Sequence, residues 1–352
     1  MNEIFLGEAY WNQRETLAHD LPRIEALFKA INKPTDLAFY VWTELIAFVL
    51  EYKPDLILEL GRGLGNSTCA FAEAASLMKP SHCHISSLCL SDDWEKTSLP
   101  KISKLISGEW LANLEIHRTD ILDFNYEALF KKHDKILIFW DAHGFEIAET
   151  VLGRILPLIQ KKSHAVIMHD MSDARYLREG SHLYYGNSLW RGKTDFEGPR
   201  VRLGNINSAV EQAVAIVDFT SRNKIPLNSA GHGLHSYFDV EPAKKAEMVR
   251  LLGAEACRMQ GDYFWFTLNA AQGPFTYPTI RKRIRFVPEV SIQQRPSRPR
   301  GPAFSERFDL DEKKRVFKRI LREAARSVDK FLLGATIYNK FYLPNKKKKD
   351  SE

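Results

Sequence analysis

The sequence of 352 residues predicts an α/β protein with a mostly parallel sheet and helices on both faces. Short apolar runs alternate along the chain with segments whose apolar residues recur at helical spacing, which is typical of strands buried on both faces. Polar side chains follow several of these runs, at the strand ends where ligands bind in such sheets. The predicted strands are 56–60, 84–90, 114–118, 135–141 and 164–170, and the predicted helices between them are 67–78, 101–106, 125–132 and 146–160.

The first region, residues 1–54, is predicted to be a helical cap. Apolar residues recur at helical spacing over 21–31 and over 37–50. Lys53 and Pro54 end the second of these helices, because proline lacks the backbone donor that a helix needs. The alternation of strands and helices begins directly afterwards.

The alternation stops after the fifth strand. Residues 171–204 are polar and rich in aromatic side chains, and a loop of this length in a compact domain is usually functional or disordered. We expect this insert to bind a substrate, since it leaves the sheet at the strand ends where ligands bind. Its aromatic faces would stack on a sugar or a phenol. Helical spacing returns at residues 207–222 and 244–252. The arginines of the insert that would bind anionic groups are Arg175, Arg178 and Arg191.

The C-terminal part of the chain has a different character. Residues 281–310 are basic and rich in proline and arginine, which is typical of an extended linker. Residues 311–352 contain an amphipathic helix with a basic face, followed by a lysine tail. Three alternatives stay open for this helix: it folds back on its own domain, it packs on a second subunit of a homo-oligomer, or residues 311–335 lie on an anionic membrane surface.

The charge of the chain is concentrated at this C-terminal end. Of the net charge of +6, residues 287–352 carry +8, from 17 Lys and Arg against 9 Asp and Glu, which leaves −2 for the rest. A nearly neutral body gives little electrostatic support to nucleic-acid binding, because that binding depends on many contacts to phosphates. We therefore expect no nucleic-acid partner.

Composition also indicates the compartment. A hydrophobic content of 44% is normal for a globular protein with a sizeable core, and no apolar run is long enough to span a bilayer. The first residues lack the basic region and apolar core of a signal peptide. The cysteines have no CxxC spacing and are expected to be reduced thiols, so the cytoplasm is the expected compartment, with membrane-surface association as the alternative. They are Cys69, Cys83, Cys89 and Cys257.

The most informative segment is the end of the first strand, where Glu59-Leu-Gly-Arg-Gly-Leu-Gly65 leads into Asn-Ser-Thr. An apolar run, a turn with glycines at alternate positions and an alanine-rich stretch together predict a strand, a tight turn and a helix. A Cβ atom at Gly61, Gly63 or Gly65 would obstruct the close approach of a nucleotide-like ligand. The spacing differs from the Gly-x-Gly-x-x-Gly of dinucleotide enzymes. It resembles the first motif of the class I methyltransferases, which bind S-adenosylmethionine.

This resemblance implies a Rossmann-like sheet of seven strands in a methyltransferase domain over residues 55–280. The last two strands would be an antiparallel pair at 234–240 and 263–268. The resemblance implies that Glu59 acts through the turn geometry or through bound waters near the methionine end of the cofactor. The three glycines would admit the ribose and the amino acid, while Asn66 and Ser67 would offer hydrogen bonds and a helix cap.

The next two strand ends supply further candidates for cofactor binding. Either Asp92 or Asp93 would accept hydrogen bonds from the ribose hydroxyls, and the choice between them stays open. Trp94, which follows, would lie against the adenine. The resemblance also places Asp120 near the adenine amino group, with Ile121 packed on the ring.

The fourth and fifth strands end in Asp141-Ala-His143 and His169-Asp170. These ends resemble the subset of class I O-methyltransferases that carry Asp-x-His and His-Asp at the same places. We expect His143 to be the general base, with Asp141 beside it, because imidazole titrates near neutral pH. In the alternative, Asp141, His169 and Asp170 hold Mg²⁺ or another divalent cation, since two facing carboxylates repel unless a cation or proton lies between them.

The resulting prediction is an S-adenosylmethionine-dependent O-methyltransferase, a transferase that acts on a hydroxyl of a small molecule or glycan. Two alternatives of other kinds stay open. One is a metal-dependent hydroxylase or hydrolase that uses the Asp/His cluster on the same scaffold. The other is a non-catalytic binding module that retains the fold. A nucleic-acid methyltransferase is a weaker candidate, since only the tail is basic.

Overall fold

The computed structural model describes residues 4–31, 37–78, 83–143, 145–169, 207–261 and 263–279. All of them belong to one compact unit, Met1–Arg283. The predicted insert at 171–204, the linker at 281–310, the C-terminal helix at 311–352 and Asp170 lie outside the described residues, so the predictions made for them stay predictions.

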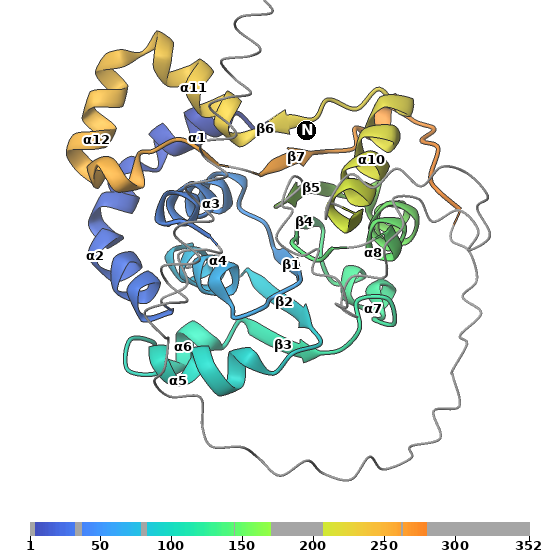
Figure 1. The fold of residues 1–352 in the computed structure, drawn as a ribbon, viewed down its shortest axis with the longest axis horizontal. Coiled ribbons are helices and arrows are strands. Elements are labelled where there is room, and N and C mark those ends of the chain that lie inside the picture. The colour runs from blue at the N-terminus through green and yellow to red at the C-terminus, as the bar shows by residue number, and fades with distance from the viewer. Residues whose placement is uncertain are drawn as a thin grey trace, which may run out of the picture. The chain divides into compact units, whose positions relative to one another are not determined.

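The described residues form a seven-stranded sheet in the order β3-β2-β1-β4-β5-β7-β6 (Figure 1). The first five strands are parallel, and β7 is antiparallel to both of its neighbours. This confirms the predicted seven-stranded, mostly parallel sheet. The strands are β1 (Leu56–Leu60), β2 (His84–Cys89), β3 (Leu114–Arg118), β4 (Lys135–Trp140), β5 (Ser163–Met168), β6 (Asn228–Ser229) and β7 (Phe264–Phe266).

The strand order reverses direction between β1 and β4, which lie side by side at the centre of the sheet. In open α/β sheets, ligands bind beyond the carboxyl ends of the strands at such a switch point. The glycine-rich segment follows β1, and Asp141 follows β4. The topology therefore brings the two most informative sequence motifs to one place.

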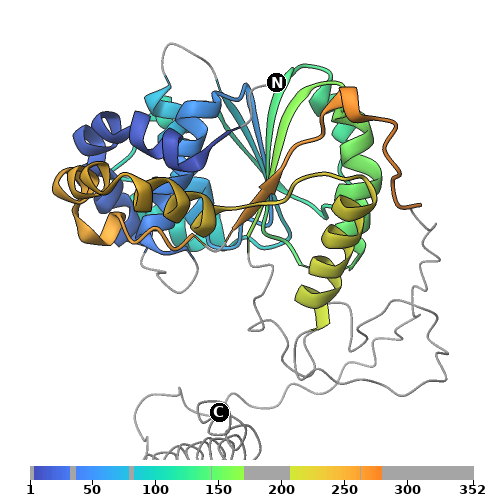
Figure 2. The same ribbon diagram turned by 90° about the horizontal axis from the view of Figure 1, so that it is seen from above.

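Helices cover both faces of the sheet, as Figure 2 shows in an edge-on view. Side chains alternate along each strand, so Ile57 and Phe139 face one core cluster while Leu58 and Ile138 face the other. The first face packs against α1 (Leu6–Asn12), α2 (Arg14–Ile31), α3 (Phe39–Tyr52), α4 (Asn66–Leu77), α5 (Leu99–Ile102), α6 (Gly108–Leu111), α11 (Ala230–Val240) and α12 (Pro242–Ala256). The second face packs against α7 (Tyr126–Phe130), α8 (Phe145–Thr150), α9 (Leu156–Ile159) and α10 (Asn207–Arg222).

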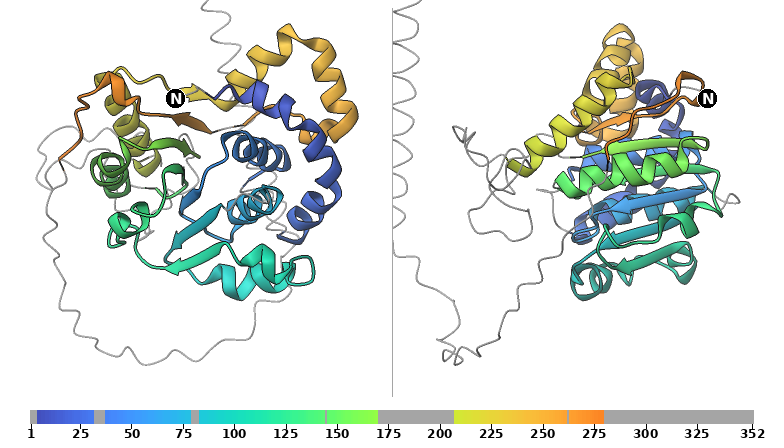
Figure 3. Two further views of the ribbon diagram at one scale, coloured as in Figure 1. Left: turned by 180° about the vertical axis from the view of Figure 1, so that it is seen from behind. Right: turned by 90° about the vertical axis from the view of Figure 1, so that its right-hand side faces the viewer.

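The N-terminal helices share the core of the sheet domain. Figure 3 shows α1 and α2 beside α11 and α12, far away in sequence. The buried Tyr10 hydroxyl donates to the Ala256 carbonyl at 2.7 Å and lies 2.9 Å from the Thr43 hydroxyl, which joins α1, α3 and α12. The helix end predicted at Lys53 and Pro54 is confirmed, since α3 ends at Tyr52 and Lys53 adopts a φ of 51°.

The structure corrects one predicted strand. Residues 234–240 belong to helix α11, and the strand at this position is the two-residue β6. The segment alternates apolar and polar residues, but its buried members Leu234 and Phe238 are also four residues apart, on one face of a helix. The Ser229 side chain caps this helix by accepting a hydrogen bond from the backbone N–H of His232.

The long helix predicted at 146–160 is interrupted. A π-helical turn at Val151–Ile155 separates α8 from α9, whose second residue is Pro157. Another π-helical turn, Trp94–Ser98, follows β2, and a 3₁₀ turn at Ala270–Gln272 follows β7. Within the described part of the chain, no helix is both long enough and apolar enough to cross a membrane.

Candidate functional site

The glycine turn, residues 61–65, joins β1 to α4 through a left-handed backbone. The φ angles of Gly61, Gly63 and Gly65 are 100°, 52° and 86°, values that favour glycine. Backbone hydrogen bonds hold the turn in place. The Gly61 N–H donates to the Leu88 carbonyl at 3.0 Å, and the Gly65 N–H donates to the Arg62 carbonyl at 2.8 Å.

The three glycines are required for different reasons. A Cβ atom at Gly61 would lie 2.7 Å from the Asp141 carbonyl oxygen, so the turn packs directly on the end of β4. A Cβ atom at Gly65 would overlap the Trp94 ring. At Gly63, by contrast, no heavy atom outside its two chain neighbours lies within 4 Å of the added Cβ. Gly63 is exposed, so a side chain there would project into open space and not into the fold.

Glu59 lies at the base of this turn and is fully buried. Its carboxylate accepts hydrogen bonds from the hydroxyls of Ser67 at 2.5 Å, Thr68 at 2.7 Å and Ser87. Burial raises the pKa of this carboxyl, whereas the three hydroxyls and the charge of Arg62 oppose the rise. Glu59 has no exposed surface, and its hydrogen bonds tie the end of β1 to α4 and β2.

Asn66 and Ser67 are also buried, at 1% and 2% exposure. Asn66 Oδ1 accepts a hydrogen bond from the Trp42 indole at 3.2 Å, which ties the start of α4 to α3. The helix cap expected from these two residues is absent, because the N-cap residue is Gly65 and makes no side-chain cap. Through Trp42 and Glu59, the Asn66 and Ser67 side chains therefore stabilise the turn from its buried side.

The end of β2 differs from the prediction in one respect. Trp94 is 1% exposed and packs against Gly65, so its ring belongs to the core and does not present a face to an adenine. Asp92 forms ion pairs with Lys96 at 2.7 Å and Arg118 at 3.1 Å, and the hydrogen bond from Lys96 is the main cause of its lowered pKa. Asp93 is exposed.

The end of β3 is a tight turn. Asp120 Oδ1 accepts a hydrogen bond from the backbone N–H of Leu122 at 2.9 Å, so the carboxylate stabilises the turn that it begins. Ile121 is 7% exposed and packs in the core, where its carbonyl accepts the Tyr126 hydroxyl at 2.6 Å. Most of the Ile121 side chain is therefore occupied by protein contacts.

Asp141 and the two histidines lie together at the carboxyl edge, as their strand ends predict. The Nδ1 atom of His169 is 3.1 Å from Asp141 Oδ1, and Nε2 of His143 is 4.0 Å from the same oxygen. The side chains are 1%, 4% and 13% exposed for His169, His143 and Asp141. The carboxylate between two imidazoles can hold either ring in place and stabilise its protonated form.

This cluster adjoins the glycine turn. The Asp141 N–H donates to the Leu60 carbonyl at 2.9 Å, and Gly61 packs on the backbone of Asp141 and Ala142. The His169 ring stacks on Phe139, with centroids 6.3 Å apart. The glycine turn and the cluster of Asp141, His143 and His169 are thus in direct contact.

The sequence did not single out three residues that shape this site: Arg62, Thr68 and Ser87. Arg62 is 2% exposed within the glycine turn, and its Nη1 donates to the Ser87 carbonyl at 2.9 Å. The available signals were a charged residue between two glycines and two adjacent serines in a predicted strand. Both are compatible with exposed positions, so neither indicated burial.

Comparisons with known proteins give matches only to solved structures. No protein-family model and no curated protein matches this chain. The chain is similar to an O-methyltransferase from Bacillus cereus in complex with SAH, with 14% identity, coverage of 60% of this chain and 82% of that one, and a TM-score of 0.35. It is also similar to the SAH-bound methyltransferase PaMTH1 from Podospora anserina, with 16% identity, coverage of 64% and 82%, and a TM-score of 0.37.

A further similar structure is the O-methyltransferase TomG from Streptomyces achromogenes in complex with SAM, with 14% identity, coverage of 65% and 82%, and a TM-score of 0.31. The strand order of this chain, its antiparallel β7 and the glycine turn after β1 give it the fold expected of a class I methyltransferase. Its activity has to be argued from its own residues.

Proposed function

We propose that this chain is an S-adenosylmethionine-dependent O-methyltransferase that acts on a hydroxyl of a small molecule or glycan. The observation that carries the proposal is the space at Gly63, whose added Cβ would meet no heavy atom outside its two chain neighbours within 4 Å, beside the Asp141 cluster. A glycine turn with this opening at the switch point of the sheet fits a cofactor that needs close backbone approach.

The residues around the turn fit the proposed cofactor. The backbone of 61–65 would approach its ribose and amino acid, and Asp92 or Asp93 would accept its ribose hydroxyls, with Asp120 nearer the base. Asp92 would share its carboxylate with Lys96 and Arg118, whereas Asp93 is exposed. When bound, S-adenosylmethionine supplies the methyl group and the leaving group.

The chain's own task in such a reaction is to position the acceptor and take its proton. His143 is the proposed general base, and the Asp141 carboxylate 4.0 Å away would stabilise its protonated form. His169, at 3.1 Å from the same carboxylate, fixes the orientation of Asp141. Base catalysis of this kind typically contributes about 10²–10⁴-fold.

Metal assistance is the alternative for the same step. Asp141, His169 and Asp170 would bind Mg²⁺ or another divalent cation, which would acidify the acceptor hydroxyl. Within the described ranges, no group of three His, Cys, Asp or Glu side chains could hold a metal ion, and Asp170 lies outside those ranges. The base mechanism and the metal mechanism therefore both stay open, and a chelator distinguishes them.

Methyl transfer from tritiated S-adenosylmethionine to cell extracts, with and without a chelator, tests the proposal. We expect a labelled small molecule or glycan whose label is lost under conditions that hydrolyse methyl esters or that cleave methyl ethers but leave methylated amines intact. Label that survives the chelator supports the base mechanism, and label that disappears supports the metal. Turnover of a substrate without S-adenosylmethionine would instead support a hydroxylase or hydrolase, and absence of any cofactor binding would support a binding module.

A further inference from the structure

Arg62 is an unusual residue for the middle of a glycine turn, because its guanidinium is buried. Only 2% of the residue is exposed, although a guanidinium stays charged at any physiological pH. Its neighbours Gly61 and Gly63 have positive φ angles, so the turn itself directs this side chain inward. A buried charge is costly unless an opposite charge and hydrogen bonds compensate it.

The compensation comes through Ser87 on β2. Arg62 Nη1 donates to the Ser87 carbonyl at 2.9 Å and to the Ser87 hydroxyl at 3.2 Å. The same hydroxyl donates to the Glu59 carboxylate. Glu59 and Arg62 are therefore linked across one serine, and the charge of Arg62 favours the ionised form of Glu59.

This link fixes the turn from two sides. Glu59 accepts the hydroxyls of Ser67 and Thr68 in the first turn of α4, and Arg62 is bonded to β2. On the opposite side, the turn abuts the Asp141 backbone at Gly61. A turn clamped between β2 and β4 has little freedom to move, so its shape depends on the buried pair.

We propose that Arg62 is a positioning residue for the cofactor site, which holds the glycine turn open for S-adenosylmethionine through Ser87 and Glu59. The inference rests on the proposed function. Arg62 Nε and Nη2 are buried without an acceptor among the described residues, so the stabilisation of this guanidinium is incomplete. The buried guanidinium therefore costs stability where it lies, which fits a role in the shape of the turn.

The test combines calorimetric titration with S-adenosylmethionine and thermal unfolding of the full chain. Arg62→Met should weaken cofactor binding at least about tenfold, because small displacements in a close-fitting site have large effects. Arg62→Lys keeps the charge but not the planar fork, and should recover part of the affinity. The double variant Glu59→Gln/Arg62→Met removes both charges, so no unpaired charge stays buried. It should therefore unfold at a higher temperature than Arg62→Met, while its affinity for the cofactor stays weak.

The ion pair between Glu73 on α4 and Arg23 on α2, whose side chain is 40% exposed, provides a control. Glu73 is 1% exposed and accepts Arg23 Nε at 2.6 Å, away from the glycine turn. Arg23→Met should lower the unfolding temperature and leave cofactor affinity within about twofold, a difference well below 1 kcal/mol.

The outcomes separate the inference from the proposed function. Wild-type affinity in Arg62→Met or in the double variant, or an affinity loss in Arg23→Met as large as in Arg62→Met, would overturn the positioning role alone. If Arg62→Met does not fold, the double variant and Arg62→Lys carry the test. Failure of the wild-type chain to bind S-adenosylmethionine would overturn the proposed function and this inference with it.

Discussion

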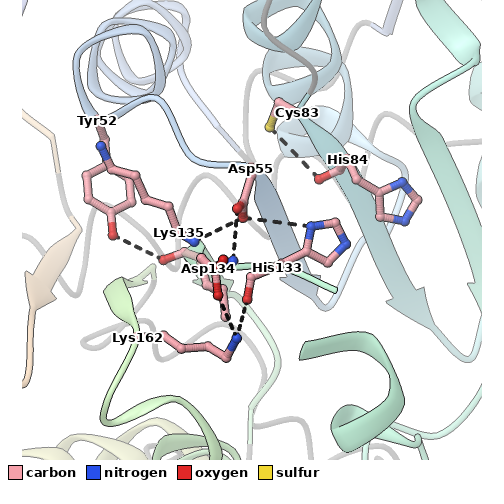
Figure 4. A network of polar contacts seen from close by, with 9 residues as sticks. Tyr52, Asp55, Cys83, His84, His133, Asp134, Lys135 and Lys162 are labelled. Carbon is pink, nitrogen blue, oxygen red and sulfur yellow. Dashed lines mark hydrogen bonds and ion pairs between the residues drawn. The ribbon is translucent and has the colours of Figure 1, made fainter. Parts of the chain in front are cut away.

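The two edges of the sheet are built differently. At the amino edge, Asp55 accepts the backbone N–H groups of Asp134 at 2.8 Å and Lys135 at 3.1 Å, while Lys162 donates to the His133 carbonyl at 2.6 Å (Figure 4). At the carboxyl edge, the same strands lead into a left-handed glycine turn and a cluster of buried Asp and His side chains. One edge uses polar groups to fix strand ends, and the other places them around an open position.

The difference indicates where substitutions affect stability and where they affect function. Paired groups at the amino edge should contribute to folding and leave ligand binding unchanged. Groups at the carboxyl edge should affect binding or turnover more than folding. Variants at the two edges test this division.

The largest effect is expected for Gly63→Val, which should weaken S-adenosylmethionine binding more than about 100-fold, or about 2.7 kcal/mol. The valine side chain would fill the space that the ligand needs, at a φ of 52° that a β-branched residue adopts poorly. Calorimetry measures the affinity, and circular dichroism measures folding.

Gly253→Val is the matched control, since Gly253 has a φ of 82°, open surroundings and a place far along the chain in α12. The control should unfold at lower temperature and bind normally. Equal binding by both variants would contradict the assignment of the site to Gly63.

His143→Ala should lower turnover by about 10²–10⁴-fold while cofactor affinity stays nearly unchanged. The reason is the place of this imidazole beside Asp141, where we propose that it takes the proton of the acceptor. Initial rates and calorimetry on the same preparation measure the two quantities. His84→Ala, at the amino edge, should leave both unchanged. Parallel loss of turnover and affinity in His143→Ala would make His143 a packing residue.

Asp55→Ala should destabilise the protein by about 1–3 kcal/mol without changing cofactor affinity. Two backbone N–H groups, those of Asp134 and Lys135, would lose their acceptor. Denaturant unfolding measures the loss, and Asp55→Asn, which keeps one acceptor oxygen, should lose less. A change in cofactor affinity without a change in the free energy of unfolding would contradict the structural role of Asp55.

The smallest effect concerns pH. His164 is fully buried, its Nδ1 lies 2.9 Å from the Lys162 carbonyl, and its Nε2 accepts the Leu268 N–H at 3.1 Å, so the ring is neutral. Burial lowers its pKa below the value of about 6.5 in the unfolded chain. The unfolded state therefore binds the proton first, and stability is lost as pH falls below about 6.5. Thermal unfolding from pH 7.5 to 5 should show a steeper decline for wild type than for His164→Gln. Identical slopes would show that His164 does not contribute.

The sequence was sufficient to predict the five parallel strands, since continuous apolar runs identify strands covered on both faces. It also predicted that Asp141 and His169 meet, because strand ends at a switch point converge. It failed at residues 234–240, where the alternation of apolar and polar residues typical of a strand occurs together with the four-residue spacing typical of a helix. Only packing decides between the strand and the helix there. It failed to detect the burial of Trp94 and Arg62, because neither residue belongs to a periodic apolar pattern that would indicate burial. Burial of such residues depends on contacts with β2 and α4 that spacing does not reveal.

Calorimetric titration of the full-length chain with S-adenosylhomocysteine, in parallel with Gly63→Val, tests the central claim most directly. We predict a saturable heat with one site per chain for the wild type and no detectable heat for the variant. Absence of heat from the folded wild-type chain, or equal heats from both proteins, would contradict the claim that the opening at Gly63 is a cofactor site.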